Sequence, residues 1–260
     1  MALSALRPLS VGEILDGAFA LYRRHFLIFF ETQVAVLGPA ILLGLLDTSL
    51  AHFLFILLNL AAVAAAIWQM SEGALGRRPD LRGALKVAVK KFLPVLGASI
   101  VLGVLVFVGL CLFILPGFLF LIMFFATLYV VVLEDNWKYC LQRSRELAKR
   151  SWRKIGLVYL ISTLISAIPS AAFGIGRAGV AFMNPKPGKS WAESVQDDMG
   201  PLAFGLQLLV QALITPFSIG VMTLLYYDQR VRKEGLDVEL AAAAIRAPAA
   251  PSPPAEAGPP

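Results

Sequence analysis

Long uncharged runs divide the chain of 260 residues. A helix needs about 20 largely apolar residues to cross the hydrocarbon layer of a membrane. Charged residues are absent from 32–46, 48–71, 92–133, 155–176 and 199–227, and the third run, of 42 residues, is long enough for two helices. The pattern therefore predicts six membrane-spanning helices, at roughly 26–46, 50–70, 92–115, 118–133, 155–175 and 202–225.

The composition points to the same class of protein. Hydrophobic residues make up 58% of the chain and charged residues 15%, whereas soluble domains hold ~45–50% and ~25%. These proportions exclude a soluble enzyme or a soluble nucleic-acid-binding protein. The expected fold class is all-α, a polytopic helical membrane protein.

Three basic amphipathic stretches each precede a pair of predicted spans. The first begins at Ser10 and Glu13, which have the spacing of a helix capping box, and the others cover 79–91 and 136–153. In each stretch, apolar residues recur at helical spacing among Lys and Arg. We therefore expect three helices that lie in the membrane interface.

The recurrence of these stretches indicates an internal repeat of about 65 residues, with one interfacial helix and one transmembrane hairpin in each copy. The first two copies align without gaps at an offset of 66, which places Leu15 on Leu81 and Phe26 on Phe92. The third copy matches only in pattern. Coincidence therefore stays open as the alternative to a true threefold repeat.

The 23 Lys and Arg residues are divided unevenly between the two sides of this topology. Twenty fall in the N-terminal segment, the two central loops and the C-terminal segment, and three fall between the fifth and sixth spans. Because basic residues favour the cytoplasmic side of a membrane, we expect both termini in the cytoplasm. The net charge of +6 then suits anionic lipid headgroups rather than nucleic acid.

The chain is expected to have three parts. Residues 1–25 form a cytoplasmic amphipathic helix, 26–240 form the six-helix membrane domain, and 241–260 form an Ala- and Pro-rich tail whose composition is typical of disorder. The first long hydrophobic stretch follows the amphipathic segment, so a cleavable signal peptide is not expected. Pro116-Gly117 is a turn signal and predicts the tip of the second hairpin.

A carboxylate lies inside the first predicted span. Glu31 is about five residues from the start of this span, ~7 Å below the cytoplasmic interface at 1.5 Å per residue. An intramembrane carboxylate is a functional candidate by default. The structural alternatives are that its side chain reaches back to the interface or that it pairs with Lys91 or Lys154.

Two polar stripes lie on the last two predicted spans. They consist of Ser162, Ser166 and Ser170 on the fifth span and of Gln207, Gln211 and Thr215 on the sixth. In antiparallel helices centred near 165 and 213, Ser162 would lie level with Thr215, Ser166 with Gln211, and Ser170 with Gln207. Each interhelical hydrogen bond contributes only ~0.6–2 kcal/mol. Structural packing is the favoured role of the stripes, and a polar conduit is the alternative.

Several motifs resemble those of one known family. They are Leu9-Ser10-Val11-Gly12-Glu13-Ile14-Leu15-Asp16, Leu21-Tyr22-Arg23-Arg24-His25-Phe26, Leu115-Pro116-Gly117, Arg143-Ser144 with Trp152-Arg153, and Tyr226-Tyr227-Asp228-Gln229-Arg230-Val231-Arg232-Lys233-Glu234-Gly235. From about Pro8 to Leu240 the chain resembles the glycerophosphoryl diester phosphodiesterase membrane-domain family of bacteria. The resemblance implies a helical module of the bacterial inner membrane, fused to a phosphodiesterase domain in some relatives and standing alone in many others.

The sequence shows no constellation for catalysis. A phosphodiesterase barrel needs ~250 residues of its own, and His25 and His52 lie in no cluster with metal-ligand spacing. We expect no enzyme activity and no cofactor. The favoured interpretation is a non-catalytic scaffold whose partners are anionic membrane lipids at the cytoplasmic face, another protein or a second copy. The alternative is a transporter or channel for a lipid or small amphiphile.

Overall fold

The computed structural model describes residues 8–44, 46–184, 187–188, 190 and 201–235. Its regular elements are α1 (Val11–Arg24), α2 (Phe26–Gly44), α3 (Thr48–Ala74), α4 (Leu81–Leu112), α5 (Ile114–Met123), α6 (Thr127–Leu133), α7 (Cys140–Ala148), α8 (Trp152–Met183) and α10 (Pro201–Glu234). Six segments are long and apolar enough to cross a membrane. The prediction of an all-α polytopic protein is therefore confirmed. The Ala- and Pro-rich tail lies outside the described residues.

Each of the six apolar segments overlaps one predicted span, although the third begins 11 residues earlier and the last two end eight and nine residues later than predicted. They are Phe26–Gly44, Ser49–Ala74, Leu81–Leu112, Leu115–Leu133, Trp152–Met183 and Ala203–Glu234. The fourth contains a bend between α5 and α6, where the Thr127 hydroxyl donates a hydrogen bond of 2.8 Å to the Phe124 carbonyl. This segment therefore consists of two helices rather than one.

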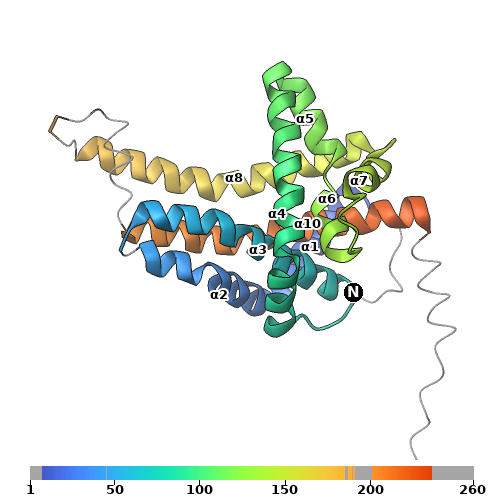
Figure 1. Cartoon of the computed structure of the whole chain (residues 1–260), viewed down its shortest axis with the longest axis horizontal. Helices are drawn as coiled ribbons and strands as arrows, with labels where there is room; N and C mark the ends of the chain where they lie inside the picture. The colour runs from blue at the N-terminus through green and yellow to red at the C-terminus, as the bar shows by residue number, and fades with distance from the viewer. Residues whose placement is uncertain (1–7, 45, 185–186, 189, 191–200, 236–260) are drawn as a thin grey trace, which may run out of the picture.

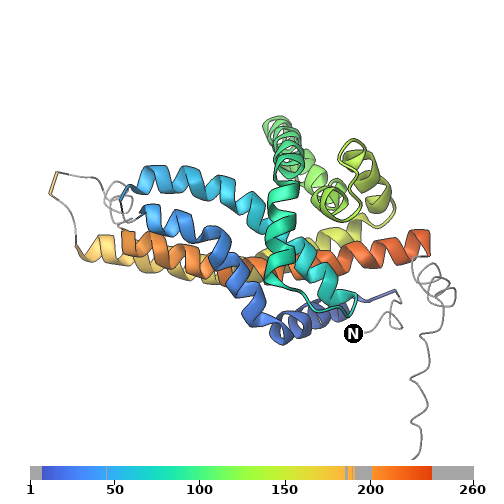
Figure 2. The same cartoon turned by 60° about the horizontal axis from the view of Figure 1, so that its bottom comes forward.

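Four of the long helices lie along a common axis. In Figure 1, α2, α3, α8 and α10 run along the long axis of the molecule, and α4 crosses them steeply. Figure 2 shows the same crossing from a second direction. The second half of α4 and the start of α5 therefore project from the other helices as a hairpin, while the end of α5 packs near α7 and α8.

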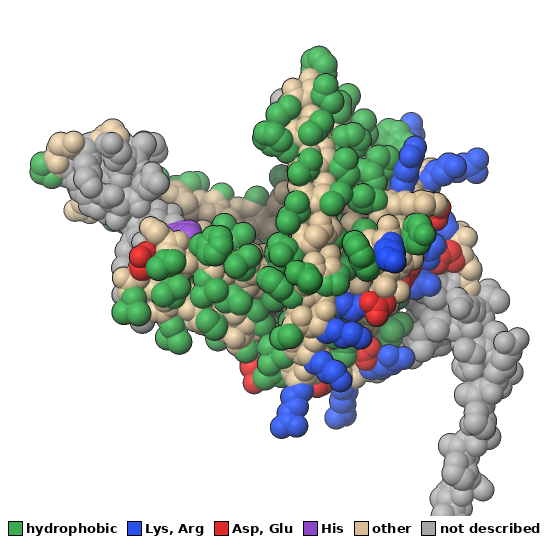
Figure 3. Space-filling model, viewed as in Figure 1, with side chains coloured by type: hydrophobic (Ala, Val, Ile, Leu, Met, Phe, Trp, Pro, Cys, Tyr) green, Lys and Arg blue, Asp and Glu red, His purple; other side chains and the backbone are tan. Residues whose placement is uncertain are grey.

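The projecting hairpin is apolar on its surface. Ile100, Val104, Phe107 and Leu115 are among its exposed side chains, and Figure 3 shows mostly hydrophobic side chains and no charged ones over the upper part of the hairpin. A patch of this size is unusual on a soluble monomer, whereas lipid tails are as apolar as these side chains. The surface of the hairpin thus suits contact with lipid.

The second amphipathic stretch is not a separate helix. Asp80 caps α4 by accepting a hydrogen bond of 2.8 Å from the Gly83 N–H, and the helix continues through Pro94 to Leu112. Of the three expected interfacial helices, α1 and α7 are separate, and the middle one forms the first turns of α4. The element order follows the expected repeat, but the steep α4–α5 hairpin is oriented differently from the other two pairs.

The turn between α4 and α5 lies earlier than predicted. Phe113 has extended backbone and connects the two helices, whereas Pro116 and Gly117 lie inside α5. A helix accepts proline in its first turn because the N–H groups there have no partner within the helix. Gly117 instead permits close packing, since a Cβ at this position would lie 2.9 Å from the backbone nitrogen of Leu110.

The last helix, α10, is the centre of the fold. It contacts α1, α2, α3, α7 and α8, and its residues Leu225 and Tyr226 are completely buried. The hydroxyl of Tyr22 on α1 donates a hydrogen bond of 2.8 Å to the Leu213 carbonyl, one turn before Pro216. The final turns of α10 then reach the end of the molecule where basic residues gather.

Candidate functional site

Lys and Arg side chains gather at one end of the molecule (Figure 3). Here the segment 226–234 of α10 meets the segment before α1, the α6–α7 region and the start of α8. We call this region the basic end. Three groups of hydrogen bonds and ion pairs fix its charged side chains. A large pocket also lies in this region.

The first group centres on Asp228, whose side chain is completely buried. Its carboxylate accepts hydrogen bonds from the Leu9 N–H (2.8 Å), from Lys154 (2.5 Å) and from Arg232 (3.0 Å). Lys154 and Arg232 also donate to the Leu9 carbonyl, at 2.6 and 2.8 Å. The start of the described chain, α8 and α10 are therefore joined at one carboxylate.

The second group joins α6, α7 and α10 through Arg143. Its Nε lies 3.0 Å from Glu134 Oε2, and its Nη1 lies 2.6 Å from Glu234 Oε1. Tyr226 donates a further hydrogen bond of 2.6 Å to Glu134. Burial acts to lower the pKa of the Arg143 guanidinium, but the hydrogen bonds to the two carboxylates outweigh burial and raise it. The guanidinium is thus a permanent cation between two acids.

The third group fixes the two ends of α7. Lys233 of α10 donates hydrogen bonds to the carbonyls of Glu146 (2.8 Å) and Lys149, which suits the negative end of the helix dipole. Before α7, Asp135 pairs with the buried Lys91 of α4, and this hydrogen bond lowers the pKa of the Asp135 carboxyl. The position of α7 is therefore set by contacts with both α10 and α4.

Both connections of α7 contain a residue in the left-handed backbone region. Asp135 has φ of 56° and Arg150 has φ of 64°, and no other described residue apart from glycine has positive φ. This conformation costs an L residue roughly 1–2 kcal/mol. Arg150 is one of the residues that line the pocket described next.

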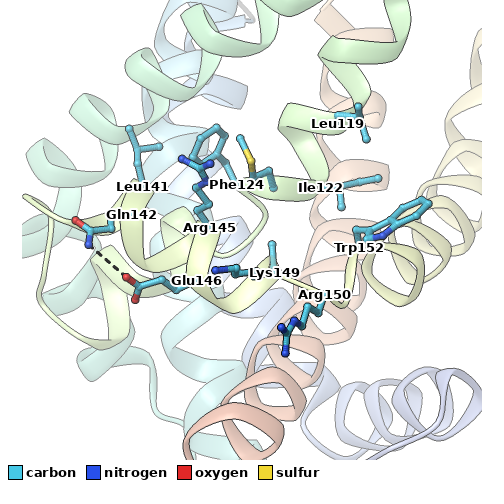
Figure 4. A pocket seen from close by; sticks show the side chains of 12 residues that line it. Leu119, Ile122, Phe124, Leu141, Gln142, Arg145, Glu146, Lys149, Arg150 and Trp152 are labelled. Carbon is cyan, nitrogen blue, oxygen red and sulfur yellow. Dashed lines mark hydrogen bonds between the residues drawn. The ribbon is translucent and has the colours of Figure 1, made fainter.

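A pocket of about 890 Å³ lies between α5, α7 and the start of α8. Its apolar wall includes Leu119 and Ile122 of α5 and Trp152 of α8. Its opposite wall carries Arg145 and Lys149 (Figure 4). We call this cavity the basic pocket.

Charge in the basic pocket is strongly unbalanced. Arg145, Lys149 and Arg150 face it together with one acid, Glu146, and the Glu146 carboxylate accepts a hydrogen bond of 3.3 Å from Gln142 (Figure 4). Guanidinium and ammonium groups bind phosphate oxygens well. Cations beside an apolar wall are suited to an anionic amphiphile, with its headgroup on the cations and its chains against α5.

A second hollow, of about 400 Å³, lies between α3, α8 and α10. Its polar lining includes Asn59, Thr163, Ser166, Ser170, Gln211, Thr215 and Ser218. Both α3 and α8 pack on α10, and the hollow lies between the two. We call it the uncharged hollow. The predicted stripes thus partly converge, because four of their six members line it.

The register of the two stripes differs from the prediction. Ser166 lies level with Ser218, and their hydroxyls are 2.5 Å apart, whereas the sequence placed Gln211 at this level. Ser162 is buried, and its carbonyl accepts a hydrogen bond of 2.8 Å from Ser166. Gln207 is exposed and does not line the hollow. The predicted helix centres were wrong because α8 and α10 extend eight and nine residues beyond the predicted ends of their spans.

Thr215 differs from the other hydroxyl residues of the hollow. Its Oγ1 is buried and makes no hydrogen bond within the part of the chain that the structure describes. The hydroxyls of Ser166 and Ser170, by contrast, donate to carbonyls of their own helix. A buried hydroxyl without a partner costs roughly 1–3 kcal/mol. This oxygen has almost no accessible surface, so a group in the hollow does not reach it in this conformation.

The expected pairing of Glu31 with a lysine is wrong. Lys91 pairs with Asp135 and Lys154 pairs with Asp228, while Glu31 is exposed on α2. Glu31 also lines neither the basic pocket nor the uncharged hollow. Its position one turn into α2 suits a side chain that reaches back to the interface.

The sequence did not identify the acids that organise the basic end. Asp228, Glu134 and Glu234 all lie at or beyond the ends of uncharged runs, where acids are common. The high density of charged and aromatic residues in 226–234 could have indicated that this segment makes many polar contacts. Seven of its nine side chains, all except Gln229 and Val231, contact other elements or each other through hydroxyl or charged groups.

No three His, Cys, Asp or Glu side chains lie close enough to hold a metal ion within the described ranges. Comparisons with protein-family models, with curated proteins and with solved structures found no match. The resemblance to the glycerophosphoryl diester phosphodiesterase membrane-domain family therefore stays a prediction that rests on the motifs.

Proposed function

We propose that this protein is a non-catalytic multi-pass module that binds anionic phospholipid in its basic pocket. The observation that carries the proposal is the placement of Arg145, Lys149 and Arg150 beside the apolar side chains of α5 and Trp152. A phospholipid presents the same two chemistries side by side. Its phosphate would lie on the cations and its acyl chains against Leu119 and Ile122.

The proposed orientation places the basic end and both termini in the cytoplasm of a bacterium, with the six spans in the inner membrane. The gathering of Lys and Arg at one end supports this orientation, because basic residues are retained on the cytoplasmic side. The inner leaflet also supplies anionic lipid. The motif resemblance supports the bacterial membrane.

The absence of catalysis is also part of the proposal. The ionic groups of 226–234 contact one another, Lys154, Arg143 and backbone carbonyls, which is a structural use of charge. We favour a binding scaffold over a transporter, because Glu31 lies apart from both cavities. A carboxylate exposed on the outer face of α2 offers no polar route between them.

The test is lipid titration of the purified full-length protein, followed by native mass spectrometry. We expect phosphatidylglycerol to bind more tightly than phosphatidylcholine. The double variant Arg145→Ala with Lys149→Ala should weaken phosphatidylglycerol binding about 30-fold, since each basic residue near an anionic surface contributes ~1 kcal/mol and 1.4 kcal/mol is tenfold.

The matched control is the double variant Arg23→Ala with Arg24→Ala. It removes the same charge from the exposed end of α1, outside the basic pocket, and should leave binding nearly unchanged. Equal losses in the two double variants would show that charge in general, and not the pocket, attracts the lipid. Equal affinity for the two phospholipids would overturn the proposal.

A further inference from the structure

The uncharged hollow is placed deep in the apolar layer. Ser166 follows the start of α8 at Trp152 by 14 residues, which is about 21 Å along the helix axis. The hydrocarbon layer of a membrane is ~30 Å thick. A group in this hollow would therefore lie well inside the layer and far from the basic end.

The side chains that line the uncharged hollow disfavour a charged ligand. The polar side chains are hydroxyls and amides, and the hollow has no Lys, Arg, Asp or Glu in its lining. An ionised phosphate or amine would lose its water there without meeting an opposite charge, which is strongly unfavourable. The chemistry of the hollow instead suits hydroxyl, ester or amide groups, which both donate and accept hydrogen bonds.

The hollow also opens toward lipid. Ser170 and Thr163 on its α8 side are exposed, and the neighbouring Leu164 and Ile168 are exposed apolar residues. A ligand with a small polar head could thus enter from the lipid and leave its chains along α8. Phospholipid headgroups are held at the membrane surface by their charge, so a head that sinks this far must be small and neutral.

We propose that the uncharged hollow binds a diacylglycerol. The free hydroxyl and the ester groups of the lipid lie among Ser170, Gln211 and Thr215, where the exposed Ser170 and the Gln211 amide offer hydrogen bonds. The acyl chains lie along Leu164 and Ile168. This site extends the proposed lipid-binding function but uses residues different from those of the basic pocket.

The experiment uses the full-length protein in phosphatidylcholine nanodiscs and a dioleoylglycerol that carries a photoactivatable diazirine. Covalent labelling is measured by mass spectrometry of peptides, with unlabelled dioleoylglycerol as competitor. We expect saturable labelling of α8 and α10 peptides. Gln211→Leu should weaken the apparent affinity at least tenfold, and Ser170→Ala, which removes an exposed hydroxyl from the lining, should weaken it several-fold.

The matched control is Gln207→Leu. Gln207 lies on the same helix, one turn from Gln211, and it is exposed outside the hollow, so its replacement should leave labelling unchanged. Equal effects of the two glutamine variants would overturn the inference. So would labelling that does not saturate, or that spreads evenly over the α4–α5 hairpin. If Gln211→Leu does not fold, Ser170→Ala takes its place, and an effect equal to that of Gln207→Leu would overturn the inference in the same way.

The two lipid sites can be tested separately. The Arg145→Ala, Lys149→Ala variant should lose phosphatidylglycerol binding and keep diacylglycerol labelling, whereas Gln211→Leu should do the reverse. Failure of labelling with intact phosphatidylglycerol binding would overturn the hollow alone. Loss of phosphatidylglycerol selectivity with intact labelling would overturn the basic pocket alone.

Discussion

The backbone N–H of Leu9 donates a hydrogen bond of 2.8 Å to the carboxylate of Asp228, which lies 219 positions later in the chain. The carboxylate is completely buried and is also paired with Lys154 and Arg232. A buried charge is tolerated only where it is paired and hydrogen-bonded. The segment before α1 and the end of α10 therefore depend on each other for their stability.

Asp228→Ala should lower the free energy of unfolding by about 3 kcal/mol, the lower end of the range for a broken buried pair. The lower end applies because the side chains of Lys154 and Arg232 are 19% and 38% exposed and can reach water. Thermal unfolding in detergent measures the effect. Asp16→Ala, which removes an exposed acid from α1, is the control, and an equal loss there would refute the role of Asp228.

The pair of Asp135 and Lys91 predicts a loss of stability in acid. The hydrogen bond from Lys91 lowers the pKa of the Asp135 carboxyl in the folded protein below its ordinary value of 3.8. Its contribution is therefore fully present above pH ~4 and is lost as the pH falls through the folded-state pKa. Asp135→Asn should unfold more easily at neutral pH and show a flatter stability curve below pH ~4. Parallel curves for the two proteins would contradict this expectation.

Arg150→Gly should stabilise the fold and weaken lipid binding at the same time. Glycine adopts φ of 64° without the strain of a Cβ, which is worth roughly 1 kcal/mol. The variant also removes one cation from the basic pocket. Arg153→Gly, in the first turn of α8, is the control and should destabilise by up to about 1 kcal/mol. A lower melting temperature for Arg150→Gly would count against backbone strain at this position.

Gly117→Ala should destabilise the α4–α5 hairpin by about 1–3 kcal/mol, the usual cost of overpacking. The new methyl group would lie 2.5 Å from Leu110 Cδ2 and 2.9 Å from the Leu110 nitrogen, and a backbone atom cannot rotate away. Gly103→Ala is the matched control in α4, since nothing lies within 4 Å of a Cβ there. The two variants are compared by thermal unfolding, and similar melting temperatures would show that the hairpin is loosely packed.

The proposed topology predicts where reporter fusions are active. A fusion at the C-terminus should report the cytoplasm, because α10 ends among the Lys and Arg residues of the basic end. A fusion after residue 48, between α2 and α3, should report the opposite side of the membrane. The reverse pattern, or the same side for both fusions, would rule out the orientation proposed for this protein.

The spans could be predicted from the sequence because the thickness of the hydrocarbon layer fixes their length. The residues that each span contacts could not be predicted in this way. Lys91 was a possible partner of Glu31 because it lies at the end of another span, but α4 crosses the other helices and Lys91 meets Asp135 instead. Likewise, Ser166 meets Ser218 rather than Gln211, a difference of seven residues or about 10 Å along α10. Apolar runs define where a helix lies in depth, but they contain little information about its tilt or its neighbours.

The cap that Lys233 places on the carbonyls of α7 has a consequence for biosynthesis. A ribosome makes α10 after all the other described helices, so α7 and the segment before α1 emerge long before the residues that fasten them. During that interval their apolar faces have the membrane surface as a partner. The basic pocket therefore cannot take its final shape while only the first five spans have been translated. It is complete only after α10, the sixth span, has been made and Lys233 has bound α7.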